Sequence, residues 1–389
     1  MNTLLKPLSV ALALLGLALA PERGAAAADT AAIKATVDRA IAPLMAQYGV
    51  PGIAVGVTVD GKAMFFNYGV ASKDKKKPVS EHTLFELGSI SKTFAATLAS
   101  YAQVTGKLSF DDHPDRYMPE LKGSPIAAAT VLNLGTYTAG GLPLQFPDEI
   151  DDDKMAAYFR DFKPEAAPGA VRRYSNPSIG LLGHVTALAL KENFADAAEH
   201  TLFPALGLKE TYLRVPAKAM ANYAWGYDDN GKPRRIHPSA LSNQFGGVKS
   251  STADMIVLLQ ANMDTARLSA PMRAAVEQTH VGYFQIDGNM VQGLGWEQYR
   301  RPLSLQHLLA GNSEKISRVA NPALKLTPPQ APLPGTLFNK TGGTGGFSSY
   351  AAFVPDQKIG VVILANRSYP IPDRIKAAHA ILEQLGPLN

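Results

Sequence analysis

Three short motifs in the sequence combine residue types that can carry out nucleophilic chemistry. The first is Ser-Ile-Ser-Lys at residues 89–92, at the head of an apolar run over 93–104. Residues three apart at the start of a helix share a face, so we expect Lys92 beside the Ser89 hydroxyl. A lysine desolvated at a helix N-terminus can have its pKa lowered enough to accept a serine proton, and the helix dipole favours an oxyanion there. The motif predicts a serine nucleophile with a lysine base.

The Ser-x-x-Lys pattern is weak on its own. In a chain of this length it is expected about once or twice by chance. A second copy stands at residues 72–75, inside a charged turn. Only the copy at Ser89 lies at the head of an apolar helix, and we therefore assign the chemistry to that copy.

The second motif is Tyr174-Ser175-Asn176, in a polar segment just before a predicted helix. An ordinary helix start, capped by Asn176 or Ser178, accounts for it without any chemistry. Alternatively, a phenol near two lysines can lose part of its proton and act as a base, while the Asn176 amide binds a substrate carbonyl. Taken alone, this segment leaves both interpretations open.

The third motif is Lys-Thr-Gly-Gly-Thr-Gly-Gly at residues 340–346, after an apolar strand. Four glycines within five positions are costly unless another chain must approach closely. Glycines at a strand edge admit a substrate backbone, and Lys340 with the Thr341 hydroxyl forms a site for a carboxylate. A plain glycine-rich turn is the alternative. Its register does not match the Gly-x-Gly-x-x-Gly pattern of nucleotide sites.

Both ends of the chain carry strand patterns. Alternating bulk on either side of Asp60-Gly61 predicts a hairpin, and similar alternation returns near the C-terminus. The expected strands are 53–59, 63–70, 336–340, 349–354 and 359–364, and the expected terminal helices are 31–47 and 375–385.

The middle of the chain is different, because apolar residues there recur mainly at helical spacing, as at 179–190 and 194–202. We expect an α/β plus all-α fold. A mixed α/β domain with an antiparallel sheet flanked by helices would be built from residues 29–105 and 206–389, and a mostly helical domain, residues 106–205, would be inserted in it. Clefts between such lobes are common places for sites.

Composition excludes several classes of chemistry. The chain has no cysteine, so thiol nucleophiles, disulfides and cysteine-ligated zinc are ruled out. The eight histidines show no His-x-His or His-Glu-x-x-His spacing, and we expect neither a metal nor another cofactor. The net charge is +5. The only basic run in the chain, residues 73–77, is interrupted by Asp74, so a nucleic-acid partner is not expected.

The first 28 residues have the pattern of a secretory signal peptide. Lys6 precedes an apolar stretch at 8–20, and small residues follow at 24–28. Cleavage is expected after Ala26, Ala27 or Ala28, with Ala20 a weaker choice. The apolar stretch is too short to span the ~30 Å core of a bilayer. The expected product is a monomer exported to the periplasm, without a membrane anchor.

Together, the three motifs resemble those of the class C serine β-lactamases, within the penicillin-recognising enzymes. Longer stretches carry the resemblance, at residues 85–89, 137–145, 292–297 and 340–355. The family has a mixed α/β domain plus a helical domain, with the site in the cleft. The resemblance implies a periplasmic cephalosporinase that hydrolyses the lactam amide of cephalosporins and penicillins and so gives β-lactam antibiotic resistance.

The resemblance also implies catalytic roles. Ser89 would attack the lactam carbonyl and become the acyl-enzyme, with Lys92 and Tyr174 sharing the base role. Which of the two is the principal base is left open. The backbone N–H groups of Ser89 and Gly343 would hold the oxyanion, and Lys340 would complete the catalytic group.

Substrate binding is implied at a second set of positions. Gln145 and Asn176 would bind the amide side chain of the lactam, and Lys340 with Thr341 its carboxylate. Two positions depart from the family pattern. Ile371 stands where many members have an asparagine, so carboxylate binding would fall on Thr341, Ser368 or Arg374. Gly246 stands where a tyrosine usually lines the side-chain pocket, which leads to the hypothesis of a wider pocket.

Other activities share this scaffold and nucleophile. D-alanyl-D-alanine carboxypeptidases and serine esterases acylate similarly but differ in substrate or deacylation. Gln145, the Tyr174-x-Asn176 motif and residues 340–355 favour the lactamase. A lactam sensor would need a transmembrane helix or a signalling partner domain, and the sequence shows neither.

Overall fold

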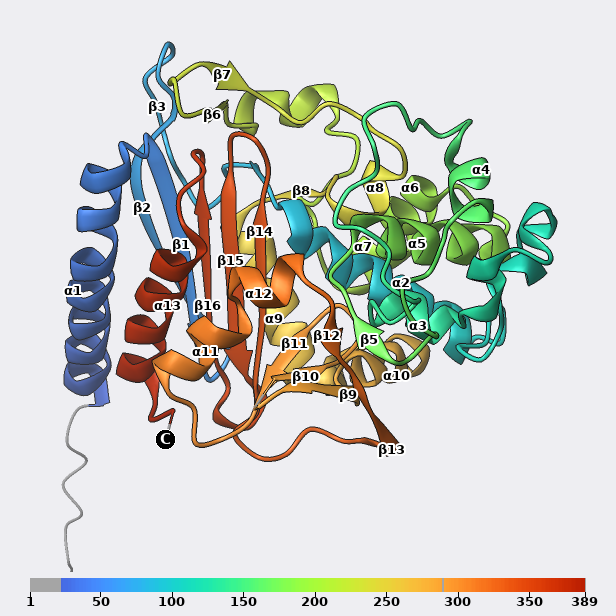
Figure 1. Cartoon of the computed structure of the whole chain (residues 1–389). Coiled ribbons are helices and arrows are strands. Elements are labelled where there is room, and N and C mark those ends of the chain that lie inside the picture. Colours follow the sequence, from blue (N-terminus) through green and yellow to red (C-terminus); the bar gives the residue numbers. More distant parts are fainter. Residues whose placement is uncertain (1–21, 289, 389) are drawn as a thin grey trace, which may run out of the picture.

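The computed structural model describes residues 22–288 and 290–388 (Figure 1). In this part of the chain, ten strands form one sheet in the order β13-β9-β10-β11-β14-β15-β16-β1-β2-β3, and neighbours pair antiparallel. The sheet strands are β1 (Gly52–Val59), β2 (Lys62–Ser72), β3 (Lys77–Pro78), β9 (Gly282–Asp287), β10 (Met290–Gln292), β11 (Glu297–Tyr299), β13 (Leu324–Gln330), β14 (Leu337–Gly343), β15 (Ser348–Val354) and β16 (Ile359–Ala365).

Three further pairs of short strands tie loops together. Each consists of two strands of two residues. The pairs are β4 (Phe85–Glu86) with β8 (Lys249–Ser250), β5 (Val171–Arg172) with β12 (Asn321–Pro322), and β6 (Gly226–Tyr227) with β7 (Pro233–Arg234).

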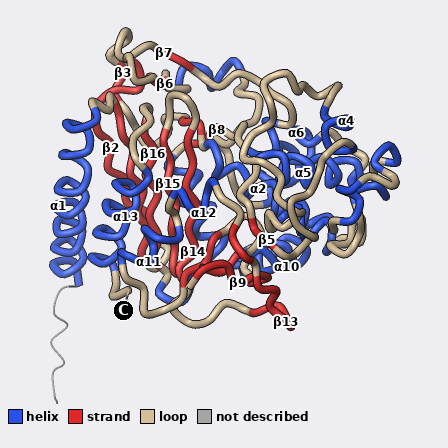
Figure 2. Tube along the Cα trace, viewed as in Figure 1, coloured by secondary structure: helices blue, strands red, loops and turns tan. Residues whose placement is uncertain are grey.

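Helices cover both faces of the large sheet and gather beside it (Figure 2). In Figure 1, α13 crosses in front of the sheet and α9 lies behind it. The helices are α1 (Glu22–Tyr48), α2 (Ser91–Val104), α3 (Val131–Gly135), α4 (Met155–Arg160), α5 (Asn176–Leu190), α6 (Phe194–Asp196), α7 (Phe203–Ala205), α8 (Ser242–Phe245), α9 (Thr252–Met263), α10 (Ala270–Thr279), α11 (Leu305–Gly311), α12 (Glu314–Arg318) and α13 (Ile371–Leu385).

Segments near the two ends of the chain form neighbouring strands of the sheet. β1 and β2 form the expected hairpin around Asp60 and Gly61, which both have positive φ, as a two-residue turn of this kind requires. β16 pairs with β1 on one side and with β15 on the other. Every residue of β15 and β16 is buried, because helices cover both faces. Segments from the two ends of the sequence thus share one sheet.

Helices dominate the region beside the sheet, where α2 packs against α5 and α10. Within residues 106–205 the one described strand is β5. The expected fold class, a mixed antiparallel sheet with helices plus a helical region, is confirmed. The domain boundaries drawn from the sequence remain a prediction. α2 and α8, which lie outside 106–205 in sequence, also pack against α5.

The structure differs from the sequence-based expectation at two elements. The strand expected to end at residue 340 continues to Gly343, so the Lys-Thr-Gly-Gly segment is strand and not turn. The N-terminal helix begins at Glu22, and most of the expected signal peptide, residues 1–21, lies outside the described residues. None of the described helices is long and apolar enough to cross a membrane.

An aromatic cluster holds the middle of the sheet together. The Phe353 ring stacks on Phe338, with centroids 5.1 Å apart and planes 9° apart. The Trp296 and Phe353 rings make an edge contact, with centroids 5.0 Å apart and planes 85° apart. All three side chains are at most 1% exposed. Because the cluster joins β14, β15 and the residue just before β11, it fixes the strand that carries Lys340.

Replacing Phe353 by alanine should therefore lower the free energy of unfolding by about 3–5 kcal/mol, the usual cost of emptying a large aromatic site. Urea denaturation followed by tryptophan fluorescence measures this change. Leu324→Ala is the matched control, since Leu324 lies on the same sheet but is 68% exposed, and it should change stability by less than about 0.5 kcal/mol. Equal losses in the two variants would contradict a core role for the cluster.

Candidate active site

Ser89 lies in a single 3-10 turn, Gly88–Ile90, directly before α2. Lys92 follows in the first turn of that helix, and its Nζ lies 2.8 Å from the Ser89 Oγ. The expected juxtaposition of nucleophile and lysine is therefore present. The short strand β4 leads into this turn, and its pairing with β8 fixes where the turn begins.

Lys92 is fully buried. Besides Ser89, its ammonium donates to the Phe245 carbonyl oxygen at 2.9 Å, at the end of α8. Burial disfavours the charged form and lowers the pKa of Lys92 to about 8, the nearby Lys340 adding to this effect while Tyr174 opposes it. A lysine in this state can take up or release a proton near neutral pH.

Tyr174 lies between two lysines. Its ring centroid is 5.1 Å from the Lys92 Nζ and 4.9 Å from the Lys340 Nζ. Burial by itself would raise the pKa of the phenol. The ammonium groups of Lys340 and Lys92, with the Ser89 hydroxyl, outweigh burial and lower it to about 8. The structure thus supplies the two lysines that the chemical interpretation of this motif requires.

Lys340 is held on β14 by a buried charge array that the sequence motifs do not include. The Glu297 carboxylate lies 3.9 Å from the Lys340 Nζ and 3.2 Å from the Arg172 guanidinium. Arg172 also donates to Gln292 at 2.9 Å and to the Ile316 carbonyl oxygen at 2.8 Å. One carboxylate therefore faces two cations that are each 1% exposed, which offsets part of the cost of burying them.

Two glycines let the strand and the nucleophile turn meet at backbone distance. Gly88 has a φ of +52°, and a Cβ there would lie 2.5 Å from the Gly343 nitrogen. A Cβ on Gly342 would lie 2.1 Å from the Leu87 carbonyl oxygen. Only glycine fits at either position. The end of β14 is therefore packed directly against the turn that carries Ser89.

Glu86 fastens the same turn to two more segments. Its carboxylate accepts hydrogen bonds from the Tyr223 hydroxyl at 2.6 Å, the Ile236 N–H at 2.7 Å and the Thr344 hydroxyl at 2.6 Å. The side chain is 1% exposed. Since Thr344 follows Gly343, this carboxylate links the segment before Ser89 to the turn after β14.

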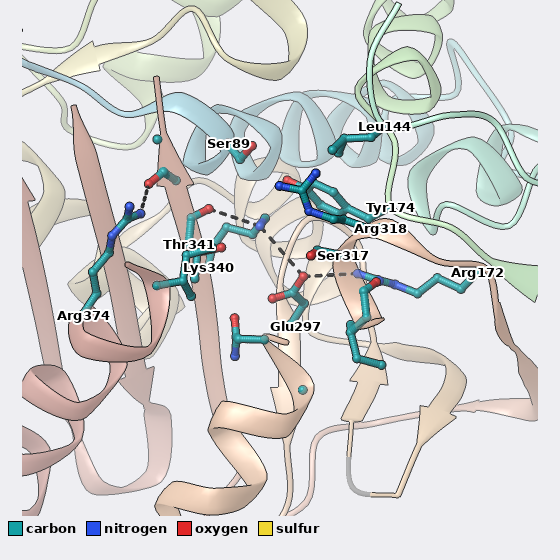
Figure 3. Close-up of a pocket in the computed structure, with 16 residues that line it drawn as sticks. Ser89, Leu144, Arg172, Tyr174, Glu297, Ser317, Arg318, Lys340, Thr341 and Arg374 are labelled. Atoms are coloured by element: carbon teal, nitrogen blue, oxygen red, sulfur yellow. Dashed lines mark hydrogen bonds and ion pairs between the residues drawn. The ribbon is translucent and has the colours of Figure 1, made fainter. Parts of the chain in front are cut away.

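A cavity of about 250 Å³ opens beside Ser89 (Figure 3). Its walls come from β14, the start of α13, the α11–α12 segment and the residues around Tyr174. It brings together most of the residues that the sequence selected for catalysis or carboxylate binding. The predicted residues that line it are Ser89, Tyr174, Lys340, Thr341, Gly343 and Arg374.

A protein-family model described as Beta-lactamase matches residues 37–386 of this chain. The chain belongs to the β-lactamase family. Among curated relatives, a β-lactamase of Pseudomonas fluorescens is 51% identical over 91% of this chain and 99% of its own length. One of Lysobacter lactamgenus is 46% identical over 96% of each chain.

Solved structures of family members have the same fold. A class C β-lactamase in complex with cefoxitin superposes with a TM-score of 0.88 at 46% identity, covering 91% of this chain and 99% of the other. A D-alanine carboxypeptidase AmpC from Burkholderia cenocepacia gives a TM-score of 0.86 at 48% identity, covering 90% and 98%. The family expected from the three motifs and its hydrolase class are confirmed.

Within this β-lactamase fold, Gln145 and Asn176 contact each other. The Asn176 amide donates to the Gln145 Oε1 at 2.6 Å. Neither lines the cavity, but Leu144, which precedes Gln145, does. The cap of α5 is Ser175, whose hydroxyl accepts from the Ser178 N–H. The alternative interpretation, in which Asn176 or Ser178 caps this helix, is therefore wrong, and the Asn176 amide is directed to Gln145 instead.

Thr341, Ser368 and Arg374 are the three candidates for binding the substrate carboxylate. Ser368 and Arg374 have surroundings that differ from those of Thr341. Ser368 is exposed and does not line the cavity. Arg374 lines it but is 5% exposed, and its guanidinium donates to the carbonyl oxygens of Gly342 and Tyr369. Burial lowers the pKa of Arg374 to about 10. The hydrogen bond to Gly342 ties Arg374 to the end of β14.

Gly246 follows Phe245, the carbonyl partner of Lys92. A Cβ at Gly246 would meet a single atom within 4 Å, the Ser242 carbonyl oxygen at 3.9 Å. A Cβ would therefore fit at this position without a clash. This observation agrees with the hypothesis of a wider side-chain pocket, which stays a prediction.

The sequence motifs missed Arg172, Glu297 and Glu86. Each is a charged residue with almost no exposure, and burial is not visible in residue spacing. A weak signal existed for two of them, because Glu86 and Glu297 fall inside the stretches 85–89 and 292–297 that carry the family resemblance.

The lowered pKa of Tyr174 gives a prediction. In Lys340→Met the phenol loses its strongest nearby positive charge, so its pKa should rise from about 8 toward the ordinary value near 10. At pH 7 less phenolate is then present. Carbon NMR of protein labelled at the tyrosine Cζ measures the titration, with Tyr174→Phe assigning the resonance.

Lys325→Met is the control for this titration. Lys325 is an exposed lysine on β13 of the same sheet, and its loss removes the same net charge without touching the cavity. The Tyr174 titration should stay near 8 in this variant. An unchanged titration in Lys340→Met would contradict the role given to Lys340.

Proposed function

We propose that this chain is a periplasmic class C β-lactamase that hydrolyses cephalosporins and penicillins through an acyl-enzyme on Ser89. The observation that carries the proposal is the cluster of Ser89 and Lys92, 2.8 Å apart, with Tyr174 held between Lys92 and Lys340. This combination gives a serine hydroxyl two neighbouring groups that can accept its proton near neutral pH.

Acylation begins when the Ser89 Oγ attacks the lactam carbonyl carbon. With pKa values near 8, about one-tenth of Lys92 or Tyr174 is deprotonated at pH 7 and available as the base. The N–H groups of Ser89 and Gly343 stabilise the oxyanion. The carbon–nitrogen bond of the lactam then breaks, and its nitrogen takes a proton from Tyr174. An ester on Ser89 results.

In deacylation a water molecule is the nucleophile, and the Ser89 oxygen is the leaving group. Tyr174 takes a proton from water as the water attacks the ester carbonyl, and the same N–H groups stabilise the second oxyanion. The carbon–oxygen bond to Ser89 then breaks, and Tyr174 passes the proton it took from water to the Ser89 oxygen. The product is the ring-opened acid, which has no antibiotic activity because the strained amide is gone.

Substrate orientation follows from the chemistry of the walls. The ring carboxylate lies against Lys340 and Thr341. Thr341 suits this role better than Arg374, whose donors are committed to backbone carbonyl oxygens, or Ser368, which lies outside the cavity. The amide side chain lies toward Gln145 and Asn176. Export by the signal peptide at residues 1–28 would bring the enzyme to where cell-wall antibiotics act.

A second candidate is D-alanyl-D-alanine carboxypeptidase activity. It is supported by two similar solved structures, the Burkholderia cenocepacia D-alanine carboxypeptidase and a β-lactamase/D-alanine carboxypeptidase from Pseudomonas syringae with a TM-score of 0.88 at 43% identity. Both activities share acylation. They differ in how fast the penicillin ester is hydrolysed.

Turnover of a chromogenic cephalosporin tests the proposal. The native protein should hydrolyse it rapidly with or without a chelator, and Ser89→Ala should lower kcat by about 1,000-fold or more. Ser72→Ala, in the other Ser-x-x-Lys copy, should leave turnover unchanged. If the native protein instead acquires one acyl group by mass spectrometry and stalls, the carboxypeptidase function replaces the lactamase.

The backbone contact at Gly88 gives a separate prediction. Gly88→Ala should lower kcat by about 100-fold, the cost of losing one oxyanion donor, because the new Cβ pushes Gly343 away from Ser89. Gly106→Ala separates this effect from backbone strain, since Gly106 also has positive φ but nothing within 4 Å. Its turnover should stay native. Full activity in Gly88→Ala would argue against Gly343 as a donor.

A further inference from the structure

We infer that Arg318 makes this enzyme selective for β-lactams with a second negative charge on the ring side of the molecule. The inference rests on the proposed function and adds a specificity-determining residue to it. Arg318 ends α12, on the wall of the cavity that also contains Ser89 and Lys340 (Figure 3).

The cavity has more positive than negative charge. Its charged lining residues are four cations, Arg172, Arg318, Lys340 and Arg374, and one carboxylate, Glu297. A single ring carboxylate on the substrate leaves a cationic excess. A substrate with two negative charges is the better electrostatic match.

Of these cations, three are already committed to protein acceptors. Arg172 binds Glu297, Gln292 and the Ile316 carbonyl oxygen. Arg374 binds backbone carbonyl oxygens, and Lys340 faces Glu297 and donates to the Thr341 carbonyl oxygen at 3.2 Å. All three side chains are at most 5% exposed, so they stay in place and set the field of the cavity, and Lys340 keeps a donor for the ring carboxylate proposed above.

Arg318 is different. Its ion-pair partner among the described residues is Glu314, 3.8 Å away, and the two side chains are 65% and 87% exposed. An exposed ion pair of this length contributes little and is easily exchanged for another anion. A guanidinium also offers paired donors that match a carboxylate. Arg318 is therefore the cation of this wall that can move to meet a ligand.

The backbone that carries Arg318 is fixed, which gives the side chain a defined origin. Buried Arg172 holds the Ile316 carbonyl oxygen two residues earlier. The Asn321 amide donates to the carbonyl oxygens of Lys315 and Val319, closing the other end of α12. Only the Arg318 side chain has to be ordered when an anion binds.

The position of α12 decides which part of the substrate Arg318 meets. Gln145 and Asn176, proposed for the acylamino side chain, do not line this cavity, whereas Lys340, Thr341 and Ser317 do. The cavity is therefore the ring end of the site. In a cephalosporin, the substituent on ring carbon 3 lies next to the ring carboxylate, and an anionic substituent there would face Arg318.

A matched pair of cephalosporins tests the inference. The two differ only in the substituent on ring carbon 3, which ends in a carboxylate in one and in the corresponding carboxamide in the other. For native enzyme at low salt, the carboxylate compound should have the higher kcat/KM. In Arg318→Gln the ratio of the two values should fall about tenfold, and Arg318→Lys should retain part of it.

Two controls isolate the local effect. Arg267→Gln removes another exposed arginine with a comparable ion pair, to Asp264 at 3.5 Å, and should leave the ratio at its native value. Raising the salt concentration should reduce the ratio in the native enzyme and have little effect in Arg318→Gln.

The outcomes separate the inference from the proposed function. An unchanged ratio in Arg318→Gln overturns the inference. If the ratio is unchanged because kcat/KM falls equally for both compounds, Arg318 acts on the shared ring carboxylate instead. If neither compound is turned over by native enzyme, the proposed function fails. The ratio of Kd values, measured by calorimetry on Ser89→Ala with and without Arg318→Gln, then decides the inference by the same tenfold criterion.

Discussion

The site depends on keeping two ammonium groups buried around one phenol. The Nζ atoms of Lys92 and Lys340 lie 5.1 and 4.9 Å from the Tyr174 ring centroid, and both lysines are at most 1% exposed. Burying like charges this close is unfavourable unless a neighbour compensates them. Glu297 supplies part of the compensation, and a partly ionised Tyr174 supplies more. The chemistry near neutral pH is a consequence of this crowding.

The fold makes the crowding rigid. Ser89 and Lys92 come from one helix start, Tyr174 from the loop before α5, and Lys340 from the sheet. No single element could bring these groups together. The backbone contact of Gly88 with Gly343 and the three hydrogen bonds of Glu86 fasten the elements to one another. The positions of the reacting groups are therefore set before a substrate arrives.

Local features of this site follow from the sequence, and long-range ones do not. Ser89 and Lys92 are three residues apart at a helix start, so their contact is a property of helix geometry. The compensation of Lys340 and Arg172 by Glu297 depends on tertiary contacts, among them the pairing of β11 with β14, which residue spacing cannot reveal. The same holds for Arg374, whose donors reach carbonyl oxygens brought near by the sheet. The family resemblance therefore predicts which residues act, whereas their buried partners are visible only in the folded structure.

The anchoring of α12 through Arg172 has an evolutionary consequence. Because one buried guanidinium holds the Ile316 carbonyl oxygen, the backbone of this wall does not depend on the side chains that α12 exposes. Those side chains can be exchanged under selection without disturbing Lys340 or Tyr174. Substrate range and catalytic competence can then drift separately, and a population facing a new antibiotic can adjust the wall at little risk to the reaction itself.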